Sequence, residues 1–117
     1  MKLGKCGSIV VPVPGTPVAL TADASLLVAV LRLTPLHGQR GAVCIGVAGM
    51  NMKTGAGVAR HFRNSVYPSG GLTDSISIES HDGSNSIAVS EYFVDAEARG
   101  EGVNFATWLT TPSTVNS

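Results

Sequence analysis

The chain has 117 residues, of which 44% are hydrophobic and only 14% are charged, and its basic and acidic residues balance at 8 each. Globular domains carry about 25% charged residues, so this composition excludes a disordered chain and indicates that a partner covers part of the apolar surface. The zero net charge lacks the basic excess of a nucleic-acid-binding protein, and we expect no nucleic-acid partner.

The first 17 residues contain two lysines, followed by an apolar run that prolines interrupt. The breaks at Pro12, Pro14 and Pro17 argue against a secretory signal, which needs an uninterrupted apolar region. No apolar stretch is long enough to cross a bilayer, so we expect a chain made and used in the cytoplasm, with no membrane partner. Because proline cannot donate to a sheet, residues 1–17 are predicted to form an extended N-terminal arm or an edge strand.

The segment "SLLVAVLRL", residues 25–33, is apolar on both faces. Propensity also allows a helix here, but nine residues are few for a helix and Pro35 ends the run. We therefore predict a central strand that is covered on both sides.

Four later segments alternate apolar and small or polar residues with a period of two, which predicts half-buried strands. In the last of them, Val103, Phe105 and Leu109 face one way, opposite Ala106 and Trp108. The predicted strands cover residues 41–48, 74–80, 86–94 and 103–109.

Glycine-rich and polar stretches separate these segments. Asp82-Gly83 within 81–86 predicts a hairpin loop between two strands. Residues 49–71 are predicted to be the longest irregular region, and residues 111–117 a polar, frayed tail. Seven or eight short strands without a helix predict an all-β, single-domain antiparallel β-sandwich or a barrel over residues 18–110.

No motif in the chain indicates catalysis, a cofactor or a metal. Lys53 follows Met52 rather than a glycine, so residues 49–57 lack the spacing of a phosphate-binding loop, and the glycines there indicate turns. His81, Asp82 and Asp74 could hold a cation, but a loop tip needs such residues in any case. Two cysteines make no disulfide framework, and we expect Cys44 to be buried and Cys6 exposed. No nucleophile elbow occurs, and we expect no enzyme.

Five stretches carry a resemblance, in this order: "PVALTADASLLVAVLRLTPL", "GQRGAVCIGVAGMNMKTG", "GGLTDSISIE", an Asp-Gly turn and "IAVSEYFVDAEARGEGVNFATWL". Together they resemble small structural proteins of tailed bacteriophages, over most of residues 16–110. The middle elements are residues 41–46, 54–55 and 71–78. The chain departs from the pattern in an extra loop at 57–70 and in the prolines of 12–17.

The resemblance implies a virion protein, most plausibly a decoration or cement protein on the capsid surface that is assembled in the host cytoplasm. It implies a jelly-roll-like β-sandwich, a homotrimer and the major capsid protein as partner. We expect the contacts to come from residues 1–17 and from the loop 49–70, through Val11, Val13, Pro14, Met50, Met52, Arg60, Phe62, Arg63 and Tyr67.

Three other functions remain open from the residues alone. A tail, neck or fibre-associated adaptor would use the same scaffold and differ in copy number. A carbohydrate-binding module would need two or three exposed aromatic residues on one face, and the chain has only one Trp, two Tyr and three Phe. The basic cluster of Arg60, His61 and Arg63 could meet an acidic patch or a nucleic-acid backbone, but a solvated loop balanced by nearby acidic residues explains it better.

Overall fold

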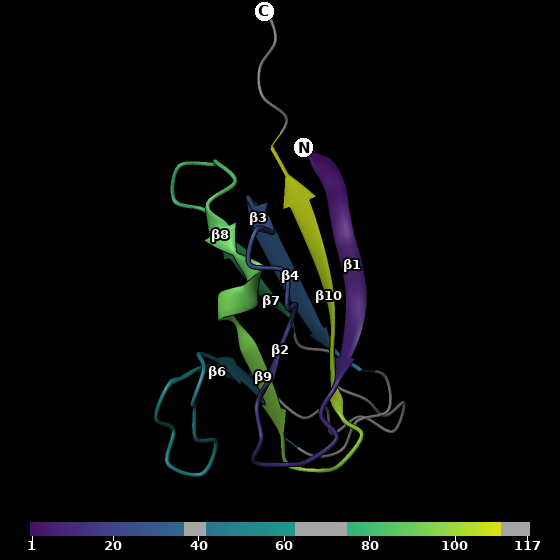
Figure 1. Cartoon of the computed structure of the whole chain (residues 1–117), viewed down its shortest axis with the longest axis vertical. Helices are drawn as coiled ribbons and strands as arrows, with labels where there is room; N and C mark the ends of the chain where they lie inside the picture. Colours follow the sequence, from purple (N-terminus) through teal and green to yellow (C-terminus); the bar gives the residue numbers. More distant parts are fainter. Residues whose placement is uncertain (37–41, 63–74, 111–117) are drawn as a thin grey trace, which may run out of the picture.

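The computed structural model describes residues 1–36, 42–62 and 75–110, and within these ranges it is all-β apart from one 3₁₀ turn, η1 (Val89–Glu91) (Figure 1). The strands follow in chain order: β1 (Lys2–Val10), β2 (Val18–Ala19), β3 (Leu27–Val28), β4 (Val30–Pro35), β5 (Val43–Gly46), β6 (Val58–Phe62), β7 (Ile76–Glu79), β8 (Ile87–Ala88), β9 (Phe93–Ala96) and β10 (Gly102–Leu109).

All pairs of strands are antiparallel, and the chain pairs with itself by doubling back. β1 pairs with β10, β2 with β9, β3 with β8, β4 with β7, and β5 with β6. Two further pairings, β10 with β4 and β9 with β5, join this ribbon of paired strands into two four-stranded sheets, and β3 with β8 remains a separate two-stranded sheet. We call them sheet A (order β1-β10-β4-β7) and sheet B (order β2-β9-β5-β6).

One core lies between the two sheets, and alternation along the strands builds it. Every second residue of β4 and β10 is buried, so that Leu31, Leu33, Val103 and Phe105 point inward. Sheet B and the connections supply the rest of the cluster: Val11, Leu20, Val28, Val43, Ile45, Phe62, Ile76, Ile87, Val89, Val94 and Ala96. The predicted antiparallel all-β fold and the strands within 41–48, 74–80 and 103–109 are therefore confirmed.

The segment 25–33 is central but is not covered on both sides. β4 lies between β10 and β7 and continues through Pro35, which pairs with Val103. Leu31 and Leu33 are buried, whereas Arg32 between them is exposed. The half-buried Val30, which lies on the same face as Arg32, made the run look apolar on both faces, so the prediction of double coverage is wrong.

The continuous strand predicted over 86–94 is also wrong, because η1 divides it into β8 and β9. The Tyr92 amide donates to the Val89 carbonyl (3.2 Å) and closes this turn. The core-facing residues are Ile87 in β8 and Val89 at the start of the turn, but Val94 and Ala96 after it. The turn thus shifts the alternation by one residue, and the chain can leave β8 and join sheet B as β9.

The loop 81–86 is not a hairpin between paired strands, because its neighbours β7 and β8 pair with β4 and β3 instead of with each other. Its Asn85 side chain holds the backbone of Thr110, accepting from the amide (2.8 Å) and donating to the carbonyl (3.1 Å). The Thr110 hydroxyl donates to the Gly83 carbonyl (2.5 Å). The loop therefore secures the end of β10.

Residues 49–71 are not irregular throughout, because they contain β6. Only its first and last residues turn inward, Phe62 being buried and Val58 half-buried, and the exposed Arg60 and His61 between them hide the strand pattern. Residues 63–74 and the predicted tail 111–117 lie outside the described residues.

Residues 2–10 adopt the second of the two predicted alternatives, an edge strand, along which Cys6 to Val10 pair with β10 residue by residue. Val11 is fully buried, and its amide donates to the Glu101 carbonyl (2.8 Å). Pro12 and Pro14 lie in the turn that follows. Because β1 is part of sheet A and Val11 is part of the core, deleting residues 1–14 would disrupt both the sheet and the core.

The placement of the core predicts that two leucine truncations, on the successive strands β3 and β4, lower the free energy of unfolding by very different amounts. Leu33→Ala empties a fully buried site on β4 and should lower the free energy of unfolding by about 3 kcal/mol. Leu27→Ala removes a side chain that is 44% exposed and should cost less than about 1 kcal/mol. Urea unfolding measures both, and equal losses would contradict the placement of the core.

Candidate functional site

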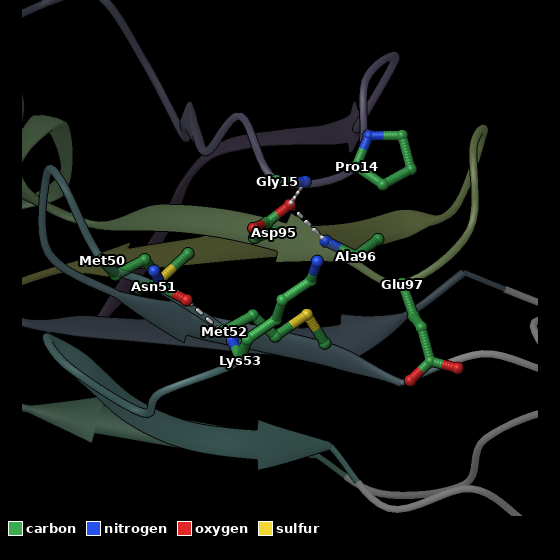
Figure 2. A pocket seen from close by; sticks show the side chains of 9 residues that line it. All are labelled: Pro14, Gly15, Met50, Asn51, Met52, Lys53, Asp95, Ala96 and Glu97. Atoms are coloured by element: carbon green, nitrogen blue, oxygen red, sulfur yellow. Dashed lines mark hydrogen bonds between the residues drawn. The ribbon is translucent and has the colours of Figure 1, made fainter.

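An open cleft of about 600 Å³ lies on the outer side of sheet B, where two loops meet the end of β9 (Figure 2). The turn 12–17 supplies Pro14 and Gly15, and the loop 47–57 between β5 and β6 supplies residues 50–53. β9 and the residue after it supply Asp95, Ala96 and Glu97. The structure thus brings together parts of both segments that the sequence predicted as contact regions.

The loop 47–57 is organised around Asn51. Its amide donates to the Ala56 carbonyl (2.7 Å), and its own carbonyl accepts from the Gly55 amide (2.8 Å). Its side-chain Oδ1 accepts from the amides of Lys53 (2.9 Å) and Thr54 (3.2 Å). These bonds give Met52 and Lys53 a defined backbone at the rim of the cleft (Figure 2).

A close approach of backbone anchors this loop to sheet B. A Cβ on Gly46 would lie 2.2 Å from the Gly57 carbonyl oxygen and 2.7 Å from the Met50 sulfur, so the contact requires glycine at position 46. Gly57 itself has φ of 73°, a conformation that favours glycine. Met50 is only 4% exposed, and it therefore packs the loop against the sheet instead of facing a partner.

Asp95 forms part of the wall of the cleft and fixes the turn 12–17. It is 1% exposed, and its Oδ1 accepts from the amides of Gly15 (3.0 Å) and Ala96 (2.8 Å), as Figure 2 shows. The tie to Gly15 joins positions 80 residues apart. A buried carboxylate that binds backbone amides in this way holds Pro14 at the edge of the cleft.

Cys44 lies opposite Asp95 in the pairing of β5 with β9. Burial, with a smaller contribution from the negative charge of Asp95, raises the pKa of the Cys44 thiol to about 11. The thiol therefore stays protonated at neutral pH and is no nucleophile, whereas Cys6 is exposed, as predicted.

The rim of the cleft combines opposite charges with a flexible apolar side chain. Lys53 and Glu97 are exposed at its rim and Met52 is half-buried, so opposite charges and a flexible apolar side chain lie together. Such a mixture suits an irregular protein surface. Among the described residues, no three His, Cys, Asp or Glu side chains gather as metal ligands. Asp74, one part of the cation site considered from the sequence, lies outside them.

The predicted contact residues divide into three groups. Val13 is 53% exposed beside the cleft, Pro14 and Met52 line it, and Arg60 is exposed on β6. Val11, Met50 and Phe62 are buried and belong to the interior, which corrects their assignment as contact residues, because alternation turns Val11 and Phe62 toward the core. Arg63 and Tyr67 lie outside the described residues.

Sequence reasoning missed Lys53, Asp95 and Glu97. The sequence did contain a signal for Asp95. A carboxylate in the middle of the apolar strand "FVDA" needs hydrogen-bond donors when the strand is buried. The sequence held no signal for Lys53 and Glu97, because only the folded loop 47–57 brings Lys53 to the cleft that Glu97 also lines.

Comparison with models of protein families, with characterised proteins and with solved structures gave no match to this chain. In the described part of the chain, no helix has the length and apolarity to cross a membrane. The function must therefore be inferred from the fold and the geometry of the chain itself.

Loss of the Asp95 carboxylate should loosen the cleft. Asp95→Ala leaves the buried Ala96 amide without its acceptor and releases Gly15, and we expect the free energy of unfolding to fall by about 1–3 kcal/mol. Asp95→Asn retains an acceptor oxygen and should cost less. Glu97→Ala, at an exposed position, is the control. A loss for Glu97→Ala as large as that for Asp95→Ala would contradict this role.

The two thiols should differ in reactivity. In the folded chain at pH 8, an aromatic disulfide reagent should modify one thiol per chain, Cys6, because only roughly a thousandth of Cys44 is ionised when its pKa is about 11. After unfolding in guanidinium chloride, two thiols should react. Rapid modification of two thiols in the folded chain would show that Cys44 is accessible.

Proposed function

We propose that this chain is a virion structural protein, a decoration or cement protein that stabilises contacts between subunits of the major capsid protein. The strand order is the observation that carries the proposal. Two four-stranded antiparallel sheets, β1-β10-β4-β7 and β2-β9-β5-β6, with the first half of the chain paired against the second, support the proposal of an eight-stranded jelly roll. Jelly rolls serve as viral capsid and lectin domains.

Aromatic residues favour the virion role over a carbohydrate-binding module. Sugar platforms need several exposed aromatic side chains on one surface. Among the described residues, Phe62 and Phe105 are buried, Tyr92 and Phe93 are half-buried near β9, and Trp108 lies on the other sheet. No described pair of exposed aromatic side chains therefore forms a platform.

The cleft is the surface that we assign to the capsid contact. Its loop is already ordered by Asn51 and its turn by Asp95, so docking requires little further ordering of the chain. A cement protein needs no catalysis or cofactor, and many copies of a modest contact stabilise a shell collectively. Exposed Val13, together with Pro14 and Met52 at the cleft, supplies apolar area for that contact.

A tail, neck or fibre adaptor is the second candidate, because the same scaffold and the same cleft would serve a ring of six or twelve copies. The homotrimer implied by the phage resemblance belongs to the capsid proposal, as does a place on the capsid surface after assembly in the host cytoplasm.

Copy number separates these candidates. In purified particles from cells that express the chain, we expect a 12.0 kDa component at hundreds of copies, quantified by gel densitometry against the major capsid protein. Met52→Asp should reduce its recovery with shells at least tenfold, because a charge at the contact must be desolvated.

Leu27→Asp is the matched control for Met52→Asp, since it places the same charge at an exposed site away from the cleft, and its recovery should be unchanged. Six or twelve copies per particle would favour the adaptor. Absence of the chain from particles would refute the virion role.

A further inference from the structure

The outer face of sheet A carries two rows of side chains that cross all four strands. The first row is Leu3, Trp108, Val30 and Glu79, and the second is Cys6, Ala106, Arg32 and Ser77, as the strand register shows. These residues alternate with the buried side chains of the core, so they point away from it. Apolar or small residues fill the β1 and β10 positions of both rows, next to one arginine and one glutamate.

The two sheets differ in how their outer faces are covered. On sheet B, the turn 12–17 and the loop 47–57 lie against the outer face, and both Asp95 and Cys44 there are buried. On sheet A, Cys6, Arg32 and Glu79 are exposed and Leu3 is 57% exposed. A face that carries a half-buried tryptophan beside exposed apolar side chains is the kind of surface that anchors protein interfaces.

We propose that this face of sheet A is covered by the same face of a second copy of the chain. The distribution of charge argues for this occupant. A two-fold axis that crosses the strands between the two rows places Trp108 of one copy over the small Ala106 of the other. It also places Arg32 of each copy beside Glu79 of the other, and no like charges of the two rows meet.

The size of the face is sufficient for a reversible dimer. Four strands at a spacing of about 4.8 Å, over a similar length along the strands, give two copies roughly 700 Å² of buried surface in total. That value lies below the range of standard interfaces and in the range of weak, transient contacts, so we expect a dissociation constant in the upper micromolar range. The inference goes beyond the virion role and does not depend on the capsid contact, since it uses the sheet opposite the cleft, but it replaces the homotrimer that the resemblance implies with a dimer.

Sedimentation of the full chain from about 1 to 200 μM tests the proposal. The weight-average mass should rise from monomer to dimer. Because Trp108 is the only tryptophan of the chain, its emission should shift to shorter wavelength over the same range as it loses contact with water. Ala106→Glu should weaken association at least tenfold, because two carboxylates then face the apolar row.

Ala59→Glu is the matched control, the same substitution at an exposed position of β6 in sheet B, and it should leave association unchanged. Arg32→Glu should weaken the dimer and the double variant Arg32→Glu, Glu79→Arg should restore it. Circular dichroism checks that each variant is folded. A monomer at 200 μM, a trimer, or a dimer that Ala106→Glu leaves intact would each overturn the proposal.

Discussion

The pairing of the first half of the chain against the second half is the constraint on which the rest of the structure depends. Each strand from β1 to β5 finds its partner between β6 and β10, and the ribbon folds over when β10 meets β4 and β9 meets β5. The outermost pair, β1 with β10, joins residues about a hundred positions apart. Closing such long loops costs entropy before the contacts form, so the ribbon should assemble outward from the β5–β6 reversal.

The same reversal creates the candidate site. The loop 47–57 is where the ribbon turns back, and the glycines at 46 and 57 let its two arms approach closely. The turn 12–17 follows β1 in sheet A and leads to β2 in sheet B, and Asp95 ties it beside that loop. The cleft therefore results from the topology. It forms where the turn 12–17, which connects sheet A to sheet B, lies beside the loop 47–57, at which the ribbon of paired strands turns back. It lies on the opposite side of the molecule from the open face of sheet A.

Alternation in the sequence was enough to predict the class of fold, because the buried Val103 and Phe105 alternate with the outward-facing Asn104 and Ala106. The prediction from alternation failed where the core-facing positions change from odd-numbered to even-numbered residues. The turn η1 causes this change, from Ile87 and Val89 to Val94 and Ala96. The prediction also failed on the edge strand β6, where Phe62 is the only fully buried side chain. For the site, Pro14 and Met52 were predicted as contact residues, and both line the cleft. Asp95 could not be predicted as their neighbour, because the sequence does not show which turn its carboxylate binds.

The positions of Lys2 and Leu109, which face each other at one end of sheet A, have a mechanical consequence. Tension applied through these two residues would act across the β1–β10 ladder at its open end. The backbone bonds would then break in succession, as in a zipper, instead of sharing the load as they do when strands are sheared. The chain should accordingly yield to weak forces along this direction, and any assembly that places it under stress would have to carry the load through the side faces of the sheets.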